Sequence, residues 1–225
     1  MKSGKKLCII GGMGPLATAD CYRRIIESSP ANTDQEHIET LIFSDSQIPD
    51  RTSCILSGES DDLIKKLQDD FKIANDWGAD LFIIPCNTCH FYMDEMKKMT
   101  NAKILNMVEI AVTKSKDKAY VFGTEGTRLS GIYKDEINKS SRSYLDLTDD
   151  ESKIVMDVIY SIKSGLEPKL KNFPKLKKIM DEKLNSGASV IVACTELSML
   201  DFDREKIIDA MGELVKAVVK EAFDA

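Results

Sequence analysis

The chain has 225 residues, of which 43% are hydrophobic and 30% charged, and its formal net charge is −6. This composition is typical of a globular protein with an ordinary charged surface, and the negative charge disfavours nucleic acid as a partner. No apolar run approaches the roughly 18 residues of a membrane span. The basic start before Leu7 leads directly into a strand rather than a signal peptide, so we expect a cytoplasmic protein without a membrane partner.

Apolar runs of strand length alternate with longer helical stretches along the chain. In chain order the runs are Leu7–Ile10, Thr40–Phe43, Leu81–Ile84, Lys103–Leu105, Ala119–Phe122 and Val190–Ala193. This alternation predicts an α/β fold with parallel sheets. Thr148 and Glu151 form a capping box before the helical run Ile154–Ile162, and Gly78 and Gly187 are placed to end helices just before strands.

The second half of the chain repeats features of the first half. Gly12 and Tyr22 recur as Gly123 and Tyr133, and a Gly-Ala pair opens a strand that ends in Cys86 in one half and Cys194 in the other, at nearly equal offsets. We therefore predict two similar α/β domains related by a pseudo-twofold axis. The first comprises residues 1–112 together with 206–225, and the second comprises residues 113–205.

Cys86 and Cys194 both follow a predicted parallel strand, where α/β sheets bind their ligands. If the two domains face each other, the two thiols line one cleft, with their sulfurs roughly 6–9 Å apart around a single reacting carbon. One thiolate can then remove a proton from one face of that carbon while the opposite thiol returns a proton to the other face. The ordinary pKa of cysteine, about 8.5, suits both roles.

Seven segments in order point to a family. The sequence resembles aspartate racemases, of the pyridoxal-phosphate-independent aspartate/glutamate racemase superfamily, in the segments Lys6–Ala19, Gln35–His37, Gln47–Thr52, Pro85–His90, Gly123–Thr127, Ile159–Gly165 and Ala193–Leu197. The resemblance implies two Rossmann-like domains with the active site between them. It also implies an isomerase without a cofactor or metal that acts on a small amino acid, and commonly a homodimer.

The resemblance also implies roles for individual residues. Cys86 and Cys194 are implied as the catalytic pair, with Cys194 acting on the L enantiomer and Cys86 on the D enantiomer. Arg51 and Lys163 are implied to hold substrate carboxylates. Further substrate-binding residues are expected at Met13, Asn87, Thr88, Thr124, Thr195 and Glu196. Glu196 can either bind the amino group or assist the second thiol.

Other interpretations compete for the same residues. Cys86 and Cys89 form a C-x-x-C motif, typical of a redox pair or half a zinc site, although the chain offers too few further ligands for zinc. Gly12–Ala17 fits the dinucleotide pattern G-x-G-x-x-A, but the acidic partner is misplaced. His90, four residues after Cys86, either tunes that thiol or packs as a core residue.

We therefore expect interconversion of L- and D-aspartate by two thiols. The alternatives are a glutamate-type or broad-specificity racemase of the same superfamily, or, from another class, a thiol-redox or ligand-binding protein that uses Cys86 and Cys89. The redox interpretation has no use for Cys194 beyond packing, which distinguishes the two classes.

Overall fold

The computed structural model describes residues 4–223, which build two four-stranded parallel sheets. The first sheet has the order β2-β1-β3-β4, formed by β1 (Lys6–Gly11), β2 (Glu39–Ser44), β3 (Leu81–Ile83) and β4 (Lys103–Ile104). The second has the order β6-β5-β7-β8, formed by β5 (Lys118–Gly123), β6 (Ser143–Leu145), β7 (Ser189–Ala193) and β8 (Ile207–Asp209). The two sheets have equivalent topologies, which confirms the predicted α/β fold with two similar halves.

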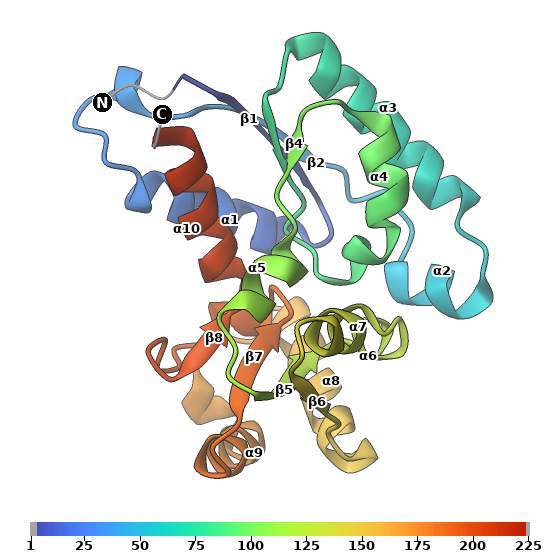
Figure 1. The fold of residues 1–225 in the computed structure, drawn as a ribbon, viewed down its shortest axis with the longest axis vertical. Helices are drawn as coiled ribbons and strands as arrows, with labels where there is room; N and C mark the ends of the chain where they lie inside the picture. Colours follow the sequence, from blue (N-terminus) through green and yellow to red (C-terminus); the bar gives the residue numbers. More distant parts are fainter. Residues whose placement is uncertain (1–3, 224–225) are drawn as a thin grey trace.

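Helices flank both sheets. The first half contains α1 (Pro15–Ser28), α2 (Arg51–Ser57), α3 (Asp61–Trp77), α4 (Met93–Met99) and α5 (Met107–Thr113). The second half contains α6 (Glu125–Leu129), α7 (Ile132–Lys139), α8 (Asp149–Lys163) and α9 (Pro174–Asn185). The last helix, α10 (Ala210–Phe223), returns to the first half and packs on α1 and α5 (Figure 1).

The predicted helix boundaries agree with local geometry. Thr148 accepts a hydrogen bond from the backbone of Glu151 while the Glu151 side chain accepts one from the backbone of Thr148, which is the predicted capping box at the start of α8. Gly78 ends α3 with a φ of +83°, and Gly187 follows α9 with the same φ. Glycine adopts this left-handed conformation without the steric cost of a Cβ atom.

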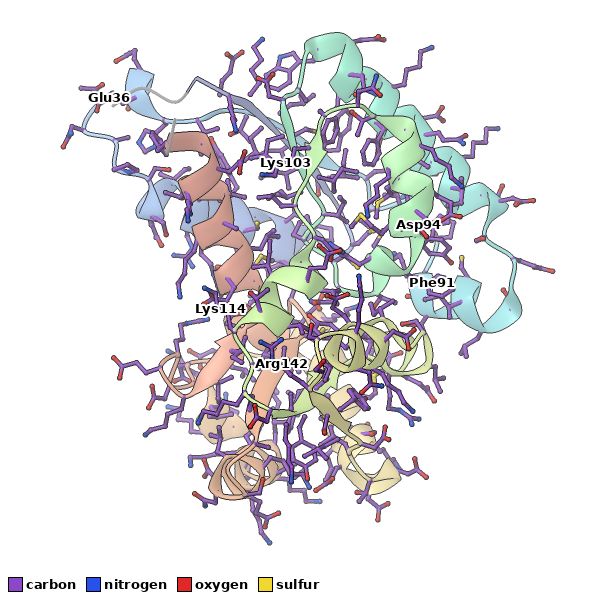
Figure 2. All side chains as sticks on the ribbon, viewed as in Figure 1. Glu36, Phe91, Asp94, Lys103, Lys114 and Arg142 are labelled. Carbon is purple, nitrogen blue, oxygen red and sulfur yellow. The ribbon has the colours of Figure 1, made fainter. Side chains whose placement is uncertain are left out.

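One hydrophobic cluster is shared by the two halves. Leu7 and Ile9 of β1 belong to the same buried cluster as Ile191 of β7, and this cluster also contains Met107 of α5 and Leu214 of α10. Each half also has its own cluster on the other face of its sheet, and side chains fill the space between each sheet and its helices (Figure 2). Because burying a large apolar side chain contributes about 1.5–3 kcal/mol, the shared cluster fixes the two halves against each other.

Two short strands, β6 and β8, are not predicted from the sequence. β6 and β8 have only three residues each and contain Ser143 and Asp209, so neither forms an apolar run. The domain boundary at residue 206 stays a prediction, although β8 pairs with β7 in the second sheet. We propose that the chain returns to the first domain after Asp209, at the start of α10. Among the helices of the described residues, none is both long and apolar enough to cross a membrane.

The strand order determines where a ligand can bind. In the first sheet the chain leaves β1 toward β2 on one side and leaves β3 toward β4 on the other, so the loops after β1 and β3 diverge. The loops after β5 and β7 diverge in the same way in the second sheet. Such switch points create a crevice at the carboxyl ends of the strands. Each half therefore contributes one crevice. Cys86 follows β3, which borders the first crevice, and Cys194 follows β7, which borders the second.

Candidate active site

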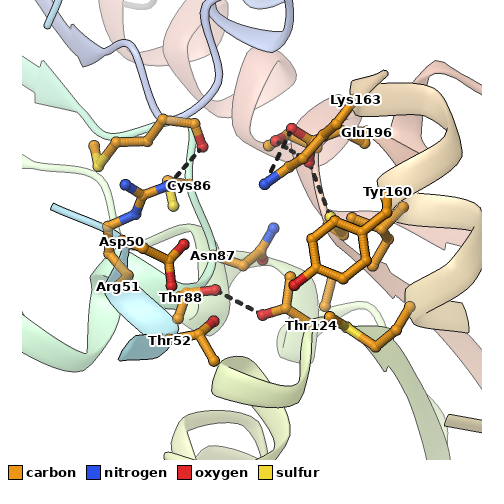
Figure 3. Close-up of a pocket in the computed structure, with 16 residues that line it drawn as sticks. Asp50, Arg51, Thr52, Cys86, Asn87, Thr88, Thr124, Tyr160, Lys163 and Glu196 are labelled. Carbon is orange, nitrogen blue, oxygen red and sulfur yellow. Dashed lines mark hydrogen bonds and ion pairs between the residues drawn. The ribbon is translucent and has the colours of Figure 1, made fainter. Parts of the chain in front are cut away.

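One cavity between the two halves is lined by every residue that the resemblance implies to be catalytic or substrate-binding (Figure 3). These residues are Met13, Arg51, Asn87, Thr88, Thr124, Lys163, Thr195, Glu196 and the two cysteines, Cys86 and Cys194. Asp50, Thr52, Met156, Ile159, Tyr160 and Ala193 complete the lining and were not selected. The cavity thus combines the loops after β1, β3, β5 and β7 with helices α2 and α8.

Cys86 lies just beyond β3 and is nearly buried. The guanidinium of Arg51, from the start of α2, lies beside it (Figure 3). Burial opposes the positive charge of Arg51, but the pKa of Arg51 is nevertheless raised because Cys86, Cys89 and Asp50 lie close to it and Cys86 hydrogen-bonds to it. The local field around Cys86 is therefore positive.

Most of the donors of Arg51 are engaged by main-chain oxygens. Nη1 donates to the carbonyls of Ile48 and Pro49 at 3.2 and 3.0 Å, and Nη2 donates to the carbonyl of Met13 at 3.3 Å. Nε is buried without a hydrogen-bond partner among the described residues. Arg51 thus lines the cavity, but in this arrangement its fork is not free for a bidentate grip on a carboxylate.

Cys194 has the opposite environment. Its Sγ donates a hydrogen bond to Oε2 of Glu196 at 3.0 Å, and Oε1 of Glu196 lies 3.9 Å from Nζ of Lys163. Burial raises the pKa of the Cys194 thiol well above its usual value, and the Glu196 carboxylate raises it further, while Lys163 acts in the other direction. This environment favours the protonated thiol.

Asn87 directly follows Cys86 and is oriented from the other half. Tyr133 of α7 donates a hydrogen bond from its hydroxyl to Oδ1 of Asn87 at 2.6 Å. The amide nitrogen Nδ2 is buried without a partner among the described residues, and the amide points into the space between Arg51 and Lys163 (Figure 3). Because a buried N–H group without a partner is costly, Nδ2 is well placed to donate to a bound anion.

Threonine hydroxyl groups connect the two halves next to the cavity. Oγ1 of Thr88 lies 2.9 Å from Oγ1 of Thr124 and 2.8 Å from Oγ1 of Thr127, so these three side chains join the first half to the second. Thr195 Oγ1 donates to Oε2 of Glu196 at 3.3 Å. These hydroxyls can exchange donor and acceptor roles, which suits a zwitterionic ligand.

The competing motifs have structural explanations. Cys89 is fully buried, and its pKa is raised mainly by burial and then by Cys86. Gly12 has a φ of +90°, and a Cβ atom there would lie 2.4 Å from the backbone of Asp45, so close backbone packing requires this glycine. No group of three or more His, Cys, Asp or Glu residues within residues 4–223 could hold a metal ion.

Some of the lining residues that were not predicted could have been identified from their position in the sequence. Met156, Tyr160 and Lys163 succeed one another at helical spacing on α8, so selecting Lys163 already defines a face that contains the other two. Thr52 follows Arg51 in a segment that was selected, and its side chain packs so closely on Gly126 that a Cβ atom there would lie 2.4 Å from Thr52 Oγ1. Ala193 and Asp50 each precede a selected residue directly.

Comparisons with known proteins agree with this arrangement. The family model described as Asp/Glu/hydantoin racemase matches residues 10–219. A broad-specificity amino-acid racemase of Bacillus subtilis is 26% identical over 222 residues, which cover 94% of this chain and 95% of that protein. The chain therefore belongs to the Asp/Glu/hydantoin racemase family. This confirms the predicted enzyme class, an isomerase that racemises amino acids.

Solved structures share the fold. An aspartate racemase of Picrophilus torridus has a TM-score of 0.78 at 24% identity, with 97% of this chain and 94% of that chain covered. An aspartate racemase homologue of Pyrococcus horikoshii has a TM-score of 0.76 at 20% identity, with 97% and 99% covered. At these identities the similarity establishes the two-domain fold.

Proposed function

We propose that this racemase interconverts L- and D-aspartate, with Cys86 and Cys194 as the two proton-transfer groups and without a cofactor. The observation that carries the proposal is the position of the two thiols, which lie at the ends of corresponding strands, β3 and β7, and line the same cavity from opposite halves. Racemisation requires a group on each face of Cα, and a pseudo-twofold pair meets that requirement.

The charges around the thiols support different starting states. Arg51 lies beside Cys86, and a neighbouring guanidinium attracts a thiolate. Glu196 accepts the hydrogen bond of Cys194, which keeps the proton on that thiol. We therefore assign the base to Cys86 and the acid to Cys194 in the enzyme form that receives the D enantiomer.

The reaction then proceeds by two proton transfers. The Cys86 thiolate removes the α-proton of D-aspartate and becomes a thiol, while the S–H bond of Cys194 breaks and delivers its proton to the opposite face of Cα. The product is L-aspartate, and Cys194 is left as the thiolate. The reverse reaction begins from this form. Three donors line the cavity and can stabilise the negative charge that develops on the α-carboxylate when Cα loses its proton. They are Nδ2 of Asn87 and the hydroxyls of Thr88 and Thr124.

Two cations suit an acidic substrate. Lys163 is 37% exposed in its side chain and is only loosely paired with Glu196 at 3.9 Å, so its ammonium group can turn toward a second carboxylate. Arg51 contributes positive charge, and its Nε is without a partner among the described residues. Both are proposed as substrate-binding residues, with Met13 as an apolar wall.

A broader substrate range is the second candidate. The Arg51 fork is largely engaged by carbonyl groups, which weakens its selectivity for a side-chain carboxylate. Tyr160, exposed at the rim beside Lys163, provides an apolar ring for other side chains. The name of the Bacillus subtilis relative, a broad-specificity amino-acid racemase, agrees with this possibility.

The test is α-proton exchange in D₂O, followed by NMR, for both enantiomers of aspartate, glutamate, alanine and serine. We expect exchange with inversion for aspartate at a kcat/KM at least about tenfold above that for the neutral amino acids, which corresponds to about 1.4 kcal/mol of selectivity. Equal rates for acidic and neutral substrates would favour the broad-specificity enzyme. Absence of exchange for every amino acid would refute the proposed activity.

A further inference from the structure

His90 lies four residues after Cys86, in the short 3₁₀ helix Thr88–Tyr92, and is 4% exposed. Its Nδ1 lies 2.9 Å from the carbonyl oxygen of Cys86, and its Nε2 lies 3.1 Å from the backbone nitrogen of Met107. A carbonyl can only accept and a backbone N–H can only donate. Nδ1 must therefore carry the proton and Nε2 must be bare, so the two contacts together define one neutral tautomer.

The surroundings of the ring favour this neutral state. Burial lowers the pKa of His90 to about 4, although the Cys86 carbonyl and the Glu109 carboxylate act in the opposite direction. A second ring proton would also place an N–H group against the N–H of Met107. His90 consequently has no free nitrogen with which to exchange a proton with the Cys86 thiol.

Met107 is the first residue of α5, and this connects the Cys86 turn to the domain interface. Met107, Val108, Ala111 and Val112 of α5 lie in the hydrophobic cluster that both halves share. The helix also packs on α10. Through its two nitrogens, His90 thus links the main chain at Cys86 to the helix that the second domain packs against.

The second half has a side-chain contact at the equivalent place. Ser198 lies four residues after Cys194, and its N–H donates to the Cys194 carbonyl at 3.0 Å. Its Oγ donates to Oδ1 of Asp209 at 2.6 Å, directly before α10. Both cysteine turns are therefore tied, by the residue four positions on, to the start of the helix that follows the edge strand. His90 and Ser198 are different residues, but each joins the cysteine turn to the following helix, so this joining contact is the feature that the two halves share.

We propose that His90 is a positioning residue that holds the Cys86 thiol in place relative to the domain interface, as the neutral Nδ1–H tautomer, and takes no part in proton transfer. The kinetic consequence rests on the proposed function. The tautomer is a property of the folded chain and does not depend on which reaction the enzyme catalyses.

The first test is ¹⁵N NMR of the histidine rings in the intact protein between pH 5 and 9. The chain has only two histidines, so a His37→Gln variant assigns the signals of His90 by elimination. We expect His90 to remain neutral and protonated on Nδ1 throughout this range. Titration of the ring within it, or a proton on Nε2, would overturn the proposal whether or not the protein racemises aspartate.

The second test separates positioning from proton transfer. His90→Asn keeps a donor at the place of Nδ1 and so retains the bond to Cys86, whereas His90→Leu loses both contacts. We expect kcat for aspartate racemisation to fall by less than about tenfold in His90→Asn but by about 100-fold in His90→Leu, with KM changed by less than about threefold, because small displacements of a reacting group are costly. The acidic limb of the pH profile should be the same in wild type and His90→Asn.

Two results would contradict positioning: a displaced acidic limb in His90→Asn, or a wild-type kcat in His90→Leu, while circular dichroism shows that both variants remain folded. His37→Gln serves as the control for replacing a histidine and should retain wild-type kcat, because His37 lies away from the cavity lining. If the wild-type protein exchanged no α-proton, the proposed function would fail while the NMR test of His90 remained decisive.

Discussion

Sγ of Cys194 donates a hydrogen bond to Oε2 of Glu196 at 3.0 Å, and this contact distinguishes the second thiol from the first. Cys86 instead lies beside the Arg51 guanidinium. Two cysteines that are related by the internal repeat thus sit in fields of opposite sign. The asymmetry matters because a two-base racemase needs its two groups in opposite protonation states.

Glu196→Gln should lower the pKa of Cys194. Burial is the larger cause of its raised pKa and remains in the variant, but the negative charge next to the thiol is removed. The Cys194 thiolate should therefore appear at lower pH than in the wild type. Thiolate absorbance near 240 nm, followed against pH and corrected with a Cys194→Ser variant, measures this shift. An unchanged or higher pKa would show that Glu196 does not control the proton of Cys194.

Tyr133→Phe should weaken substrate binding. The Tyr133 hydroxyl can only donate to Oδ1 of Asn87, which turns Nδ2 toward the cavity, and loss of a hydrogen bond of this kind costs about 0.5–1.5 kcal/mol. We expect KM for aspartate to rise by about three- to tenfold. Tyr22→Phe is the matched control, since Tyr22 occupies the corresponding place in the first half, outside the cavity lining. A KM that rises equally in both variants would point to a general loss of stability.

Cys89→Ala should leave racemisation within about twofold of the wild type, since loss of one buried sulfur costs about 1 kcal/mol of stability and removes no group from the cavity. Steady-state kinetics with both aspartate enantiomers measures it, alongside Cys194→Ala. The redox interpretation makes the reverse prediction. It would be supported if Cys89→Ala abolished activity while Cys194→Ala did not.

Asp70→Asn should stabilise the protein at neutral pH. Asp70 on α3 is buried, and its Oδ2 has no hydrogen-bond partner among the described residues. Burial, followed by the charge of Asp45, raises the pKa of Asp70 to about 6 from its ordinary 3.8. The folded state therefore favours the protonated acid, and this contribution is lost as the pH rises from about 4 through about 6.

The gain from Asp70→Asn should accordingly be about 1–2 kcal/mol in the free energy of unfolding at pH 7.5 and smaller at pH 4.5. Urea unfolding at the two pH values measures it. The exposed neighbour provides the control, because Asp69→Asn should change stability little at either pH. A gain that is equal at both pH values would mean that the charge of Asp70 is not the cause.

Much of the site follows from sequence because its residues directly succeed buried strands. Cys86 and Cys194 end the same repeated segment, so the repeat alone indicated that they would occupy equivalent places. The resemblance to known racemases added Arg51 and Lys163, whose sequence surroundings are those of ordinary surface residues. All of these residues line the cavity.

The contacts between the halves could not be predicted. Tyr133 reaches Asn87, and Gly14 lies where a Cβ atom would be 3.2 Å from Oε1 of Glu196, only because the two domains dock in one particular orientation. The engagement of Arg51 by three carbonyls depends on the path of the loop before α2 and on Met13 in another loop. Strands β6 and β8 are edge strands of three residues each, too short to form an apolar run that could be recognised in the sequence.

The two-thiol mechanism is tested most directly by α-proton exchange in D₂O, measured by NMR with both enantiomers of aspartate on Cys86→Ser and Cys194→Ser. Serine keeps the shape of cysteine but is a far weaker acid, so neither variant should racemise aspartate. Cys86→Ser should still exchange the α-proton of the L enantiomer with retention, and Cys194→Ser that of the D enantiomer, if the implied assignment of faces holds. If Cys86→Ser exchanged the D enantiomer and Cys194→Ser the L enantiomer, the two thiols would act on the opposite faces of Cα, and the two-thiol mechanism would still hold. Racemisation at the wild-type rate by either single variant would contradict it.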